Sequence, residues 1–593
     1  MDRGYDYAAI YDGCAERECL PVIRSVRPPA IHRPPRDLVS FCRIMVGFRY
    51  ISSARGTRSA HREPVHMGPG FVSWPPVLAP RDTNMKPPIR PLSLARALCL
   101  IATAVVASGG APAAGQQRAV ATASITADYA TTTTEAGKFN FGISSWPKLN
   151  SKYAALVASS GITMVRADVY LYDLVPRTTK AADRVTDVPT TVATYNLDLH
   201  RRGGPIGAAN PTNWNWDPTF DSEVPTTKDL ARWKKAGVPL LLIINSVPSW
   251  LGYDPSMGVG WYGSDSSVPM DWAIWTDLNK KAFAHYKNKA DWFESINEPD
   301  GEGWSLSLAN SPYSSTLDAY KDIYFYAAKG WQQVKGYQTK HFGGPTSASS
   351  DPYFLTGLLG DSRTRDEVDF ATWHSYLGYT ELDGNVPAWK AAAAAAGKPD
   401  LPLFVDEWNY SAAANADPLN NGSPDAISYV GLRLTSFIKA GADGSFIFNS
   451  SDDQSAFDAS WRNQWTYINN DGQLQPKAAT FRLLSKDLDL GEGTFDVNAT
   501  TTAGTGVTLS AAATNADGQR VVWAVNDGTT PTTTDVTLTN LGISGQVLLT
   551  HYLAAAGNDA TAPYATEVVP VSGGNASVSI TIPAKSVYGI MIA

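Results

Sequence analysis

The sequence predicts an α/β protein, a (β/α)8 TIM barrel followed by a C-terminal antiparallel β-sandwich domain that an N-terminal strand completes. Between residues 138 and 487, short apolar runs alternate eight times with longer amphipathic segments. From 488 to 593, Thr, Val, Ala and Gly dominate and apolar residues alternate with polar ones. The first pattern is typical of parallel strands covered on both faces, and the second of half-buried antiparallel strands. We therefore expect a barrel over 138–487 and a sandwich over 488–593.

Eight apolar runs are the predicted barrel strands, and their spacing fits a barrel with inserted loops. They are Phe139–Ile143, Met164–Ala167, Leu240–Asn245, Trp292–Ile296, His341–Gly344, Phe370–His374, Leu403–Val405 and Ser445–Phe448. Helices are expected between them, most clearly at 318–334 and 426–440. The six alanines at 391–396 are interpreted as an exposed helix. The longest insertion, roughly 170–225, contains the aromatic segment 213–217 and could wall the site.

The sandwich strands are predicted from alternation between turn residues. The clearest candidates are Gly506–Leu509, Arg520–Val525 and Ala576–Ile582. The segment Ala119–Thr134 is equally β-like but precedes the barrel. We therefore expect residues 115–137 to supply a strand to the sandwich and to bring the two ends of the chain together.

The N-terminal region is predicted to lie outside the folded protein. Residues 1–84 hold twelve Arg, ten Pro and no Lys, without a sustained helical or strand period. Met85 is followed by basic residues, an apolar stretch over 98–106 and small residues at 111–114. This order is typical of a secretory signal peptide, and the apolar stretch is too short for a permanent membrane anchor. We therefore assign 85–114 to a signal peptide and expect a secreted or periplasmic protein. Residues 1–84 are either a mis-assigned start or a genuine disordered extension.

Composition narrows the class of partner. Residues 1–114 hold all four Cys, 15 of the 49 basic residues and 8 of the 56 acidic ones. The remainder therefore carries 34 basic and 48 acidic residues, a balance that disfavours nucleic acid and anionic membranes as partners. Its five His are scattered without helical metal-ligand spacing, so neither a metal nor another cofactor is predicted. The 18 Trp and 26 Tyr serve either core packing or sugar stacking. The oligomeric state is left open.

Two glutamates end predicted strands. The fourth strand leads into the motif SINEPD at 295–300, and the seventh lies within LFVDEWN at 403–409. In this fold the carboxyl ends of the strands face the active site. A single Glu beside Pro often serves only as a helix-start charge. However, Glu298 and Glu407 would face each other across the barrel, and two such carboxylates are what glycoside hydrolysis requires.

The two motifs resemble the signatures of clan A glycoside hydrolases. The stretch from Glu407 through 426–440 to 446–449 is most similar to glycoside hydrolase family 39, the β-xylosidase and α-L-iduronidase family. The resemblance covers roughly residues 138–485, and families 5, 30, 51 and 79 share the motifs. It implies a retaining O-glycoside hydrolase that is β-xylosidase-like and acts on plant or microbial polysaccharides or oligosaccharides.

Roles for individual residues follow from the resemblance. It makes Glu298 the acid/base, Glu407 the nucleophile and Asn297 the residue that binds the 2-hydroxyl of the reacting sugar. Arg166, at the end of the second strand, matches an arginine beside the nucleophile, where a fixed cation would keep Glu407 ionised. The alternative for Arg166 is a purely structural salt bridge.

The remaining candidates would line the sugar site. His374 and Tyr376, in the motif TWHSY, match such positions, and the alternative is that they are satisfied polar residues of the barrel wall. Loop tryptophans are candidate sugar platforms or packing residues. They are Trp250, Trp261, Trp304, Trp461 and Trp465. The last two are considered because the eighth strand ends in Phe448-Asn449, where clan members often have Trp. The first motif also departs from the family, which usually has Trp where Ile296 stands.

The predicted reaction is double displacement with the two carboxyl groups roughly 5–5.5 Å apart. A transglycosylase would use the same residues with a sugar as acceptor. A non-catalytic carbohydrate-binding protein on a decayed hydrolase fold would not need the carboxylate pair. The sequence leaves open the sugar, the linkage and the choice between endo and exo action.

Overall fold

The computed structural model of the chain describes most of the residues that follow the predicted signal peptide. The described residues are 122–134, 137–145, 151–174, 216, 225–248, 251–254, 266–301, 306–411, 419, 423–450, 466–469, 471–557 and 562–593. All of them fall in one compact unit. The predicted signal peptide and the five loop tryptophans lie outside the described residues. Within the ranges described, no helix is long and apolar enough to cross a membrane.

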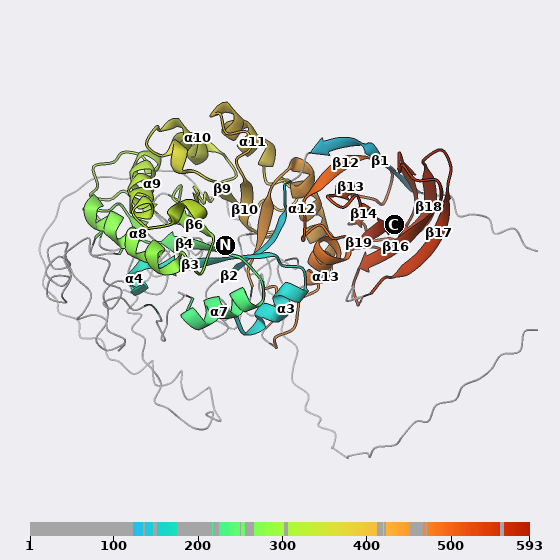
Figure 1. Ribbon diagram of the computed structural model, residues 1–593, viewed down its shortest axis with the longest axis horizontal. Helices are drawn as coiled ribbons and strands as arrows, with labels where there is room; N and C mark the ends of the chain where they lie inside the picture. The colour runs from blue at the N-terminus through green and yellow to red at the C-terminus, as the bar shows by residue number, and fades with distance from the viewer. Residues whose placement is uncertain are drawn as a thin grey trace, which may run out of the picture. The chain divides into compact units, whose positions relative to one another are not determined.

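Eight parallel strands form the barrel (Figure 1). In chain order they are β2 Asn140–Ser145, β3 Met164–Tyr170, β4 Leu240–Asn245, β6 Trp292–Ser295, β8 His341–Gly343, β9 Ala371–Ser375, β10 Leu403–Trp408 and β11 Gly444–Phe448. The sheet order is β8-β6-β4-β3-β2-β11-β10-β9. Between β8 and β9 the barrel closes through backbone bonds, in which Asp369 N donates to Phe342 O and His374 N donates to Ser347 O. All eight predicted strands are confirmed to within a few residues.

Helices and short elements connect the strands. They are η1 Ser151–Tyr153, α3 Ala154–Ser159, α4 Leu171–Leu174, α7 Thr227–Lys235, β5 Ser266–Ser267, α8 Trp272–Tyr286, β7 Leu306–Ser307, α9 Thr316–Gln332, η4 Tyr337–Thr339, α10 Tyr353–Gly360, η5 Arg365–Glu367, α11 Val386–Ala395, α12 Ala426–Ala440, α13 Ala478–Arg482 and the π-helical turn η8 Leu483–Asp487. The predicted helix at 426–440 matches α12, and that at 318–334 matches α9 within two residues. The alanine run lies in α11 and at its end, largely exposed except for Ala393.

The inward side chains of β3 and β10 change from apolar to charged along the strand. Near the amino ends, a small cluster fills the interior with Met164, Leu241, Ile243, Phe370, Phe404 and Phe446. Two residues further along their strands, Arg166 follows Met164 and Asp406 follows Phe404, and both are buried. Side chains two apart in a strand point to the same face. The charged residues therefore lie inside the barrel as well, one layer closer to the carboxyl ends of the strands than the apolar cluster.

Nine strands form the second sheet. They are β1 Ala123–Thr134, β12 Phe495–Gly504, β13 Leu509–Asn515, β14 Arg520–Asn526, β15 Thr532–Thr539, β16 Gly545–Ala554, β17 Ala565–Val571, β18 Ala576–Ile582 and β19 Ser586–Ile592. Their order is β17-β16-β19-β14-β13-β12-β1-β15-β18, and the two edge strands contact each other. Strand β1 pairs antiparallel with β12 and parallel with β15, which confirms the predicted N-terminal strand.

Two of the three strands predicted inside the sandwich are confirmed, as β14 and β18. The prediction at Gly506–Leu509 is wrong, because β13 only begins at Leu509. Gly504 and Gly506 have φ of 87° and 92°, values that favour glycine and turn the chain between β12 and β13. Residues 506–508 therefore lie in the turn before β13, although their polar and apolar residues alternate as in a strand.

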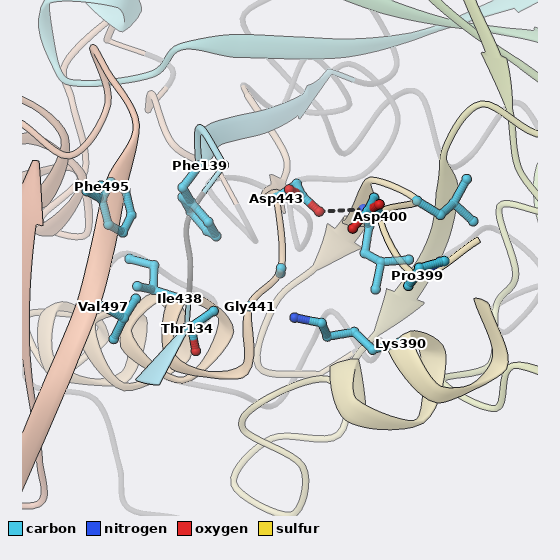
Figure 2. A pocket seen from close by; sticks show the side chains of 14 residues that line it. Thr134, Phe139, Lys390, Pro399, Asp400, Ile438, Gly441, Asp443, Phe495 and Val497 are labelled. Atoms are coloured by element: carbon cyan, nitrogen blue, oxygen red, sulfur yellow. Dashed lines mark hydrogen bonds between the residues drawn. The ribbon is translucent and has the colours of Figure 1, made fainter. Parts of the chain in front are cut away.

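The end of the barrel opposite the catalytic motifs carries a cavity of about 280 Å³. Figure 2 shows its lining, which includes Lys390 of α11, Asp443 before β11 and Phe495 of β12. Asp443 accepts a hydrogen bond from Leu403 N, at the first residue of β10. The cavity thus lies at the amino ends of the strands, far along β10 from Glu407.

Most of the insertion at 170–225 lies outside the described residues, so the suggestion that it walls the site stays a prediction. Trp216 stacks on His285 with ring centroids 3.9 Å apart and contacts Tyr286 edge-on. These residues end α8, which leads into the amino end of β6. Trp216 therefore packs near the amino ends of the strands, away from the mouth. Contact with the two rings stabilises its indole there.

Candidate active site

The carboxyl ends of β3, β6, β9 and β10 bring together the six non-tryptophan candidates. We call this end of the barrel the mouth, defined by Arg166, Asn297, Glu298, His374, Tyr376 and Glu407. Arg166 stands in its centre and is fully buried. Its Nη1 donates to Glu407 Oε2 at 2.9 Å and to Ser144 Oγ at 3.0 Å. Its Nη2 donates to Asn297 Oδ1 and lies 3.3 Å from His374 Nε2.

Glu407 reaches the interior through an irregularity in β10. Val405 pairs with Trp373 and Glu407 pairs with His374, so Asp406 and Glu407 together occupy one step of the neighbouring strand. Such a bulge re-aims a side chain. As a result Asp406 and Glu407 both meet Arg166, while Trp408 packs outward into the main core. Tyr376 donates to Glu407 Oε1 at 2.5 Å, so each carboxylate oxygen has a donor.

Glu298 lies in the turn that follows β6. Ile296 and Glu298 have φ of 59° and 49°, a left-handed conformation that L residues rarely adopt because it costs energy. Backbone bonds hold the turn, because Glu298 N donates to Thr346 O at 2.9 Å. Asp300 also accepts from the amides of Ala348 and Ser349. The strained turn is thus tied to the loop after β8.

Asn297 is oriented from two sides. Its backbone N donates to Asn245 Oδ1 at 3.1 Å, and Asn245 is the last residue of β4. The same Oδ1 also accepts from Ser246 N, while Asn245 Nδ2 donates to Asp168 Oδ1. The Asn297 carbonyl oxygen faces the Arg166 guanidinium. Because a guanidinium only donates, this contact fixes which way round the Asn297 amide sits.

His374 connects the two glutamates. Its Nδ1 lies 2.7 Å from Glu298 Oε1, and its Nε2 lies 3.7 Å from Glu407 Oε2. Arg166 Nη2 points at Nε2 and can only donate, so Nε2 is best assigned as the acceptor. A neutral His374 with its proton on Nδ1 then donates to Glu298. One imidazole ring therefore has the two carboxyl groups on its two sides.

Two buried acids beneath the mouth were not predicted. Asp406 Oδ2 lies 2.9 Å from Arg166 Nε, and Glu294 Oε2 lies 3.8 Å from the same atom. Burial raises the pKa of Glu294 to about 7, against the opposing effect of Arg166. Burial and then Glu294 raise the pKa of Asp406 well above its usual range. For Arg166, burial alone lowers the pKa, but Asp406 and Glu407 raise it well above the ordinary value. The sequence feature that could have revealed them is an acidic residue inside an apolar strand, Glu294 in β6 and Asp406 in β10.

The other predictions stand as follows. Arg166 contacts Glu407 as the resemblance implies, and it also makes the structural ion pair that was the alternative. Phe448 is buried, and its carbonyl accepts from Asn409 Nδ2. Across the described ranges, no group of three or more His, Cys, Asp or Glu side chains is arranged to hold a metal ion.

Comparison with known proteins supports the fold. No protein-family model matches the sequence, and no curated protein matches it either. Among solved structures, a family 30 subfamily 8 xylanase from Clostridium acetobutylicum is similar, with a TM-score of 0.53, 15% identity, and coverage of 79% of this chain and 99% of that one. A GH39 enzyme from Xanthomonas axonopodis pv. citri is similar with a TM-score of 0.52 and 15% identity, and the match covers 81% of this chain and 99% of that one. A monomeric β-xylosidase from Caulobacter crescentus is similar with a TM-score of 0.50 and 16% identity, and the match covers 79% of this chain and 99% of that one.

The class that these observations define is a (β/α)8 barrel with an attached β-sandwich and a buried carboxylate pair at the mouth. Such low identities show the fold alone. The solved structures that share this fold include an enzyme titled as a family 30 xylanase and one titled as a GH39 enzyme.

Proposed function

We propose that the protein is a retaining O-glycoside hydrolase, with Glu298 as acid/base and Glu407 as nucleophile. The observation that carries the proposal is the asymmetry between the two carboxyl groups. Glu407 accepts a hydrogen bond from the Arg166 guanidinium on one oxygen and from the Tyr376 hydroxyl on the other, so both of its oxygens are held in place. Glu298 contacts the neutral His374 instead. One group suited to attack and one suited to carry a proton are what the reaction needs.

In the first step Glu407 attacks the anomeric carbon. The bond between that carbon and the leaving oxygen breaks, and Glu298 gives its proton to the leaving oxygen. A glycosyl ester to Glu407 forms. Arg166 and Tyr376 hold the attacking carboxylate in place, so little reorganisation is needed as the reaction proceeds.

In the second step Glu298, now ionised, takes a proton from water. The water oxygen attacks the anomeric carbon, and the ester bond to Glu407 breaks. Two inversions give net retention. The hydrogen bond from His374 Nδ1 stabilises Glu298 in its ionised form during this step, which matches its change of role from acid to base.

The proposed substrates are xylose-type oligosaccharides or polysaccharides. The solved structures of this fold include enzymes described as xylanases and as β-xylosidases. Asn297 is placed to bind the 2-hydroxyl of the reacting sugar, with its amide oriented by Arg166 and its backbone by Asn245. The predicted signal peptide makes export part of the same proposal, because such polymers lie outside the cell. N-terminal sequencing of exported protein would check the cleavage site.

A stereochemical assay tests the proposal. Purified protein is screened against aryl xylosides, arabinosides, galactosides and glucosides, and proton NMR then follows the first-formed product of the best substrate. Retained configuration is expected, and an inverted anomer would refute double displacement. Glu407→Ala is the control, because it abolishes turnover by an enzyme but leaves the affinity of a carbohydrate-binding protein unchanged. Added xylose or alcohol acceptors distinguish a transglycosylase, which would form transfer products faster than free sugar.

A further inference from the structure

One face of α12 packs against the sandwich. Four residues spaced three or four apart make this stripe, namely Ser428, Gly431, Thr435 and Lys439. Trp523 Nε1 of β14 donates to Thr435 Oγ1 at 2.8 Å, and Lys439 Nζ donates to Ser510 O at 2.9 Å. A Cβ on Gly431 would lie 2.4 Å from Val587 of β19, so the approach is close enough to require glycine.

The adjacent stripe of α12 holds the segment that carries Tyr376. We call residues 375–381 the tyrosine segment. Arg433 Nη2 donates to Ser375 O at 3.2 Å and to Ser375 Oγ at 2.9 Å, while its Nη1 donates to Glu381 O at 2.7 Å. Tyr429 donates to Gly378 O at 3.2 Å. Three attachment points thus flank Tyr376 on the chain, and all come from one helix.

The sandwich also forms a direct hydrogen bond with the tyrosine segment. Asp527 follows the last residue of β14, and its Oδ2 accepts from the Tyr379 hydroxyl at 2.9 Å. Its Oδ1 accepts from Ser428 Oγ at 2.6 Å and from Lys585 Nζ at 3.1 Å. One carboxylate therefore joins the sandwich, the start of α12 and the tyrosine segment. The Asp527 side chain is 16% exposed and Tyr379 is 42% exposed, so the carboxylate is the more shielded partner of this bond.

We propose that Asp527 and Arg433 are positioning residues for the reaction, and that the sandwich domain holds Tyr376 against Glu407 through them. The inference rests on the function proposed above. Tyr376 and Glu407 come from different strands, and their hydrogen bond of 2.5 Å depends on where the tyrosine segment sits. Misplacement of a catalytic contact by about 1 Å can reduce a rate about 100-fold. The sandwich then completes the active site without supplying a group that touches substrate.

A double-mutant cycle tests the proposal. Asp527→Ala is made in the wild-type protein and in Tyr376→Phe, and kcat and KM are measured with the best aryl glycoside. A residue that acts through Tyr376 has nothing to act on once the hydroxyl is gone. We expect kcat to fall about 5- to 20-fold in the wild-type background, in line with loss of one hydrogen bond to a charged group. In Tyr376→Phe the fall should be less than about 2-fold, with KM little changed in either background. Equal losses in both backgrounds, or no loss in either, would overturn the proposal.

Milder variants separate positioning from misfolding. Tyr379→Phe removes one tyrosine hydroxyl that is bonded to an aspartate and should lower kcat about 3- to 10-fold. Tyr313→Phe is the matched control, because Tyr313 donates to Asp322 on α9 and the described hydrogen bonds, ion pairs and ring contacts of these two side chains reach only Ser311, Trp272 and Arg363. It should leave kcat unchanged. Asp527→Asn keeps an acceptor for Tyr379 and should restore most of the activity lost in Asp527→Ala. If Tyr313→Phe and Tyr379→Phe lower kcat equally, the effect is general destabilisation and the positioning role is refuted.

A measurement that needs no activity keeps this inference distinct from the proposed function. Hydrogen–deuterium exchange is followed in peptides that cover the tyrosine segment. Asp527→Ala and Tyr379→Phe should speed exchange there at least about 10-fold, while Tyr313→Phe should not. If the wild-type protein hydrolyses no glycoside, the proposed function fails, and faster exchange would still support the mechanical link. Unchanged exchange in a folded Asp527→Ala protein would overturn the link whatever the activity.

Discussion

The mouth of the barrel and the interior of the sandwich are both shielded from water, but they are filled with opposite kinds of side chain. The sandwich core consists of apolar side chains, and strands such as β18 alternate strictly between buried and exposed residues. At the mouth, Arg166, Glu298, Asp406 and Glu407 are each at most 4% exposed. Buried apolar area stabilises a fold, whereas buried charge opposes folding unless it is paired.

The difference indicates a division of labour. Removing a sandwich side chain should reduce stability and spare the chemistry. Neutralising one carboxylate at the mouth should abolish the chemistry but change stability little, because Arg166 keeps another buried carboxylate as its partner. Asp527 and Arg433 are expected exceptions, since they connect the two regions.

The largest effect is expected for Glu407→Gln. The amide cannot form the glycosyl ester, so kcat should fall roughly 10⁵-fold. The thermal unfolding midpoint should stay within a few degrees of wild type, because the variant also removes one charge from the crowded set around Arg166. Steady-state kinetics and calorimetry check both statements. A variant that keeps a tenth of the wild-type kcat would refute the nucleophile assignment.

Glu298→Gln should have a smaller effect that depends on the leaving group. General acid catalysis contributes about 10²- to 10⁴-fold, and a good leaving group needs little of it. We therefore expect kcat/KM to fall by about that amount for xylobiose and far less for a dinitrophenyl xyloside. The comparison uses the two substrates as mutual controls. Equal losses on both would mean that Glu298 does not protonate the leaving oxygen.

Leu549→Ala tests the sandwich side of the contrast. Leu549 of β16 is fully buried in the sandwich core, whereas its neighbour Leu548 is 42% exposed on the same strand. Loss of the buried side chain should lower the free energy of unfolding by about 2–5 kcal/mol, while Leu548→Ala should change it by less than about 0.5 kcal/mol. Both proteins should keep wild-type kcat below their unfolding transitions. A large loss of kcat in folded Leu549→Ala would break the division of labour.

The two regions also differ in how far their sequences predicted them. Uniform apolar runs located all eight barrel strands, and alternation located β1, β14 and β18, because each pattern follows directly from which faces are covered. The positions of Glu298 and Glu407 at strand ends followed from the same reasoning. In the sandwich, the run predicted at 506–509 failed because two glycines with positive φ turn the chain before β13, and the remaining strands were not predicted one by one.

At the mouth, regular alternation is not enough. Strict alternation on β10 would send Glu407 outward if Phe404 and Asp406 point inward, and only the bulge brings both acids inside. Likewise, the positive φ of Ile296 and Glu298 re-aims the end of β6. The hydrogen bond between Tyr379 and Asp527 joins residues 148 positions apart, and the periodicity of a single strand cannot predict such a contact. Sequence patterns therefore located the strands, but not the irregularities that orient the site.

The smallest effect concerns the proton beneath the mouth. Because burial raises the pKa of Glu294 to about 7, the folded protein keeps a proton that the unfolded chain releases near the ordinary glutamate pKa of 4.5. Stability from this group is present at low pH and is lost as pH rises through about 7. Between those values the free energy of unfolding should fall by at most about 1.4 kcal/mol per pH unit.

Glu294→Gln should flatten this slope, as measured by urea unfolding at a series of pH values from 4.5 to 7. Glu492→Gln, at a site where the side chain is 63% exposed, should leave the wild-type slope in place. The test also sharpens the contrast between the regions, because burial lowers the pKa of His551 in the sandwich, so that group adds stability as pH rises, in the opposite direction to Glu294. If Glu294→Gln retains the full slope while Asp406→Asn loses it, the retained proton belongs to Asp406, and the charge that Arg166 neutralises beneath the nucleophile is that of Glu294.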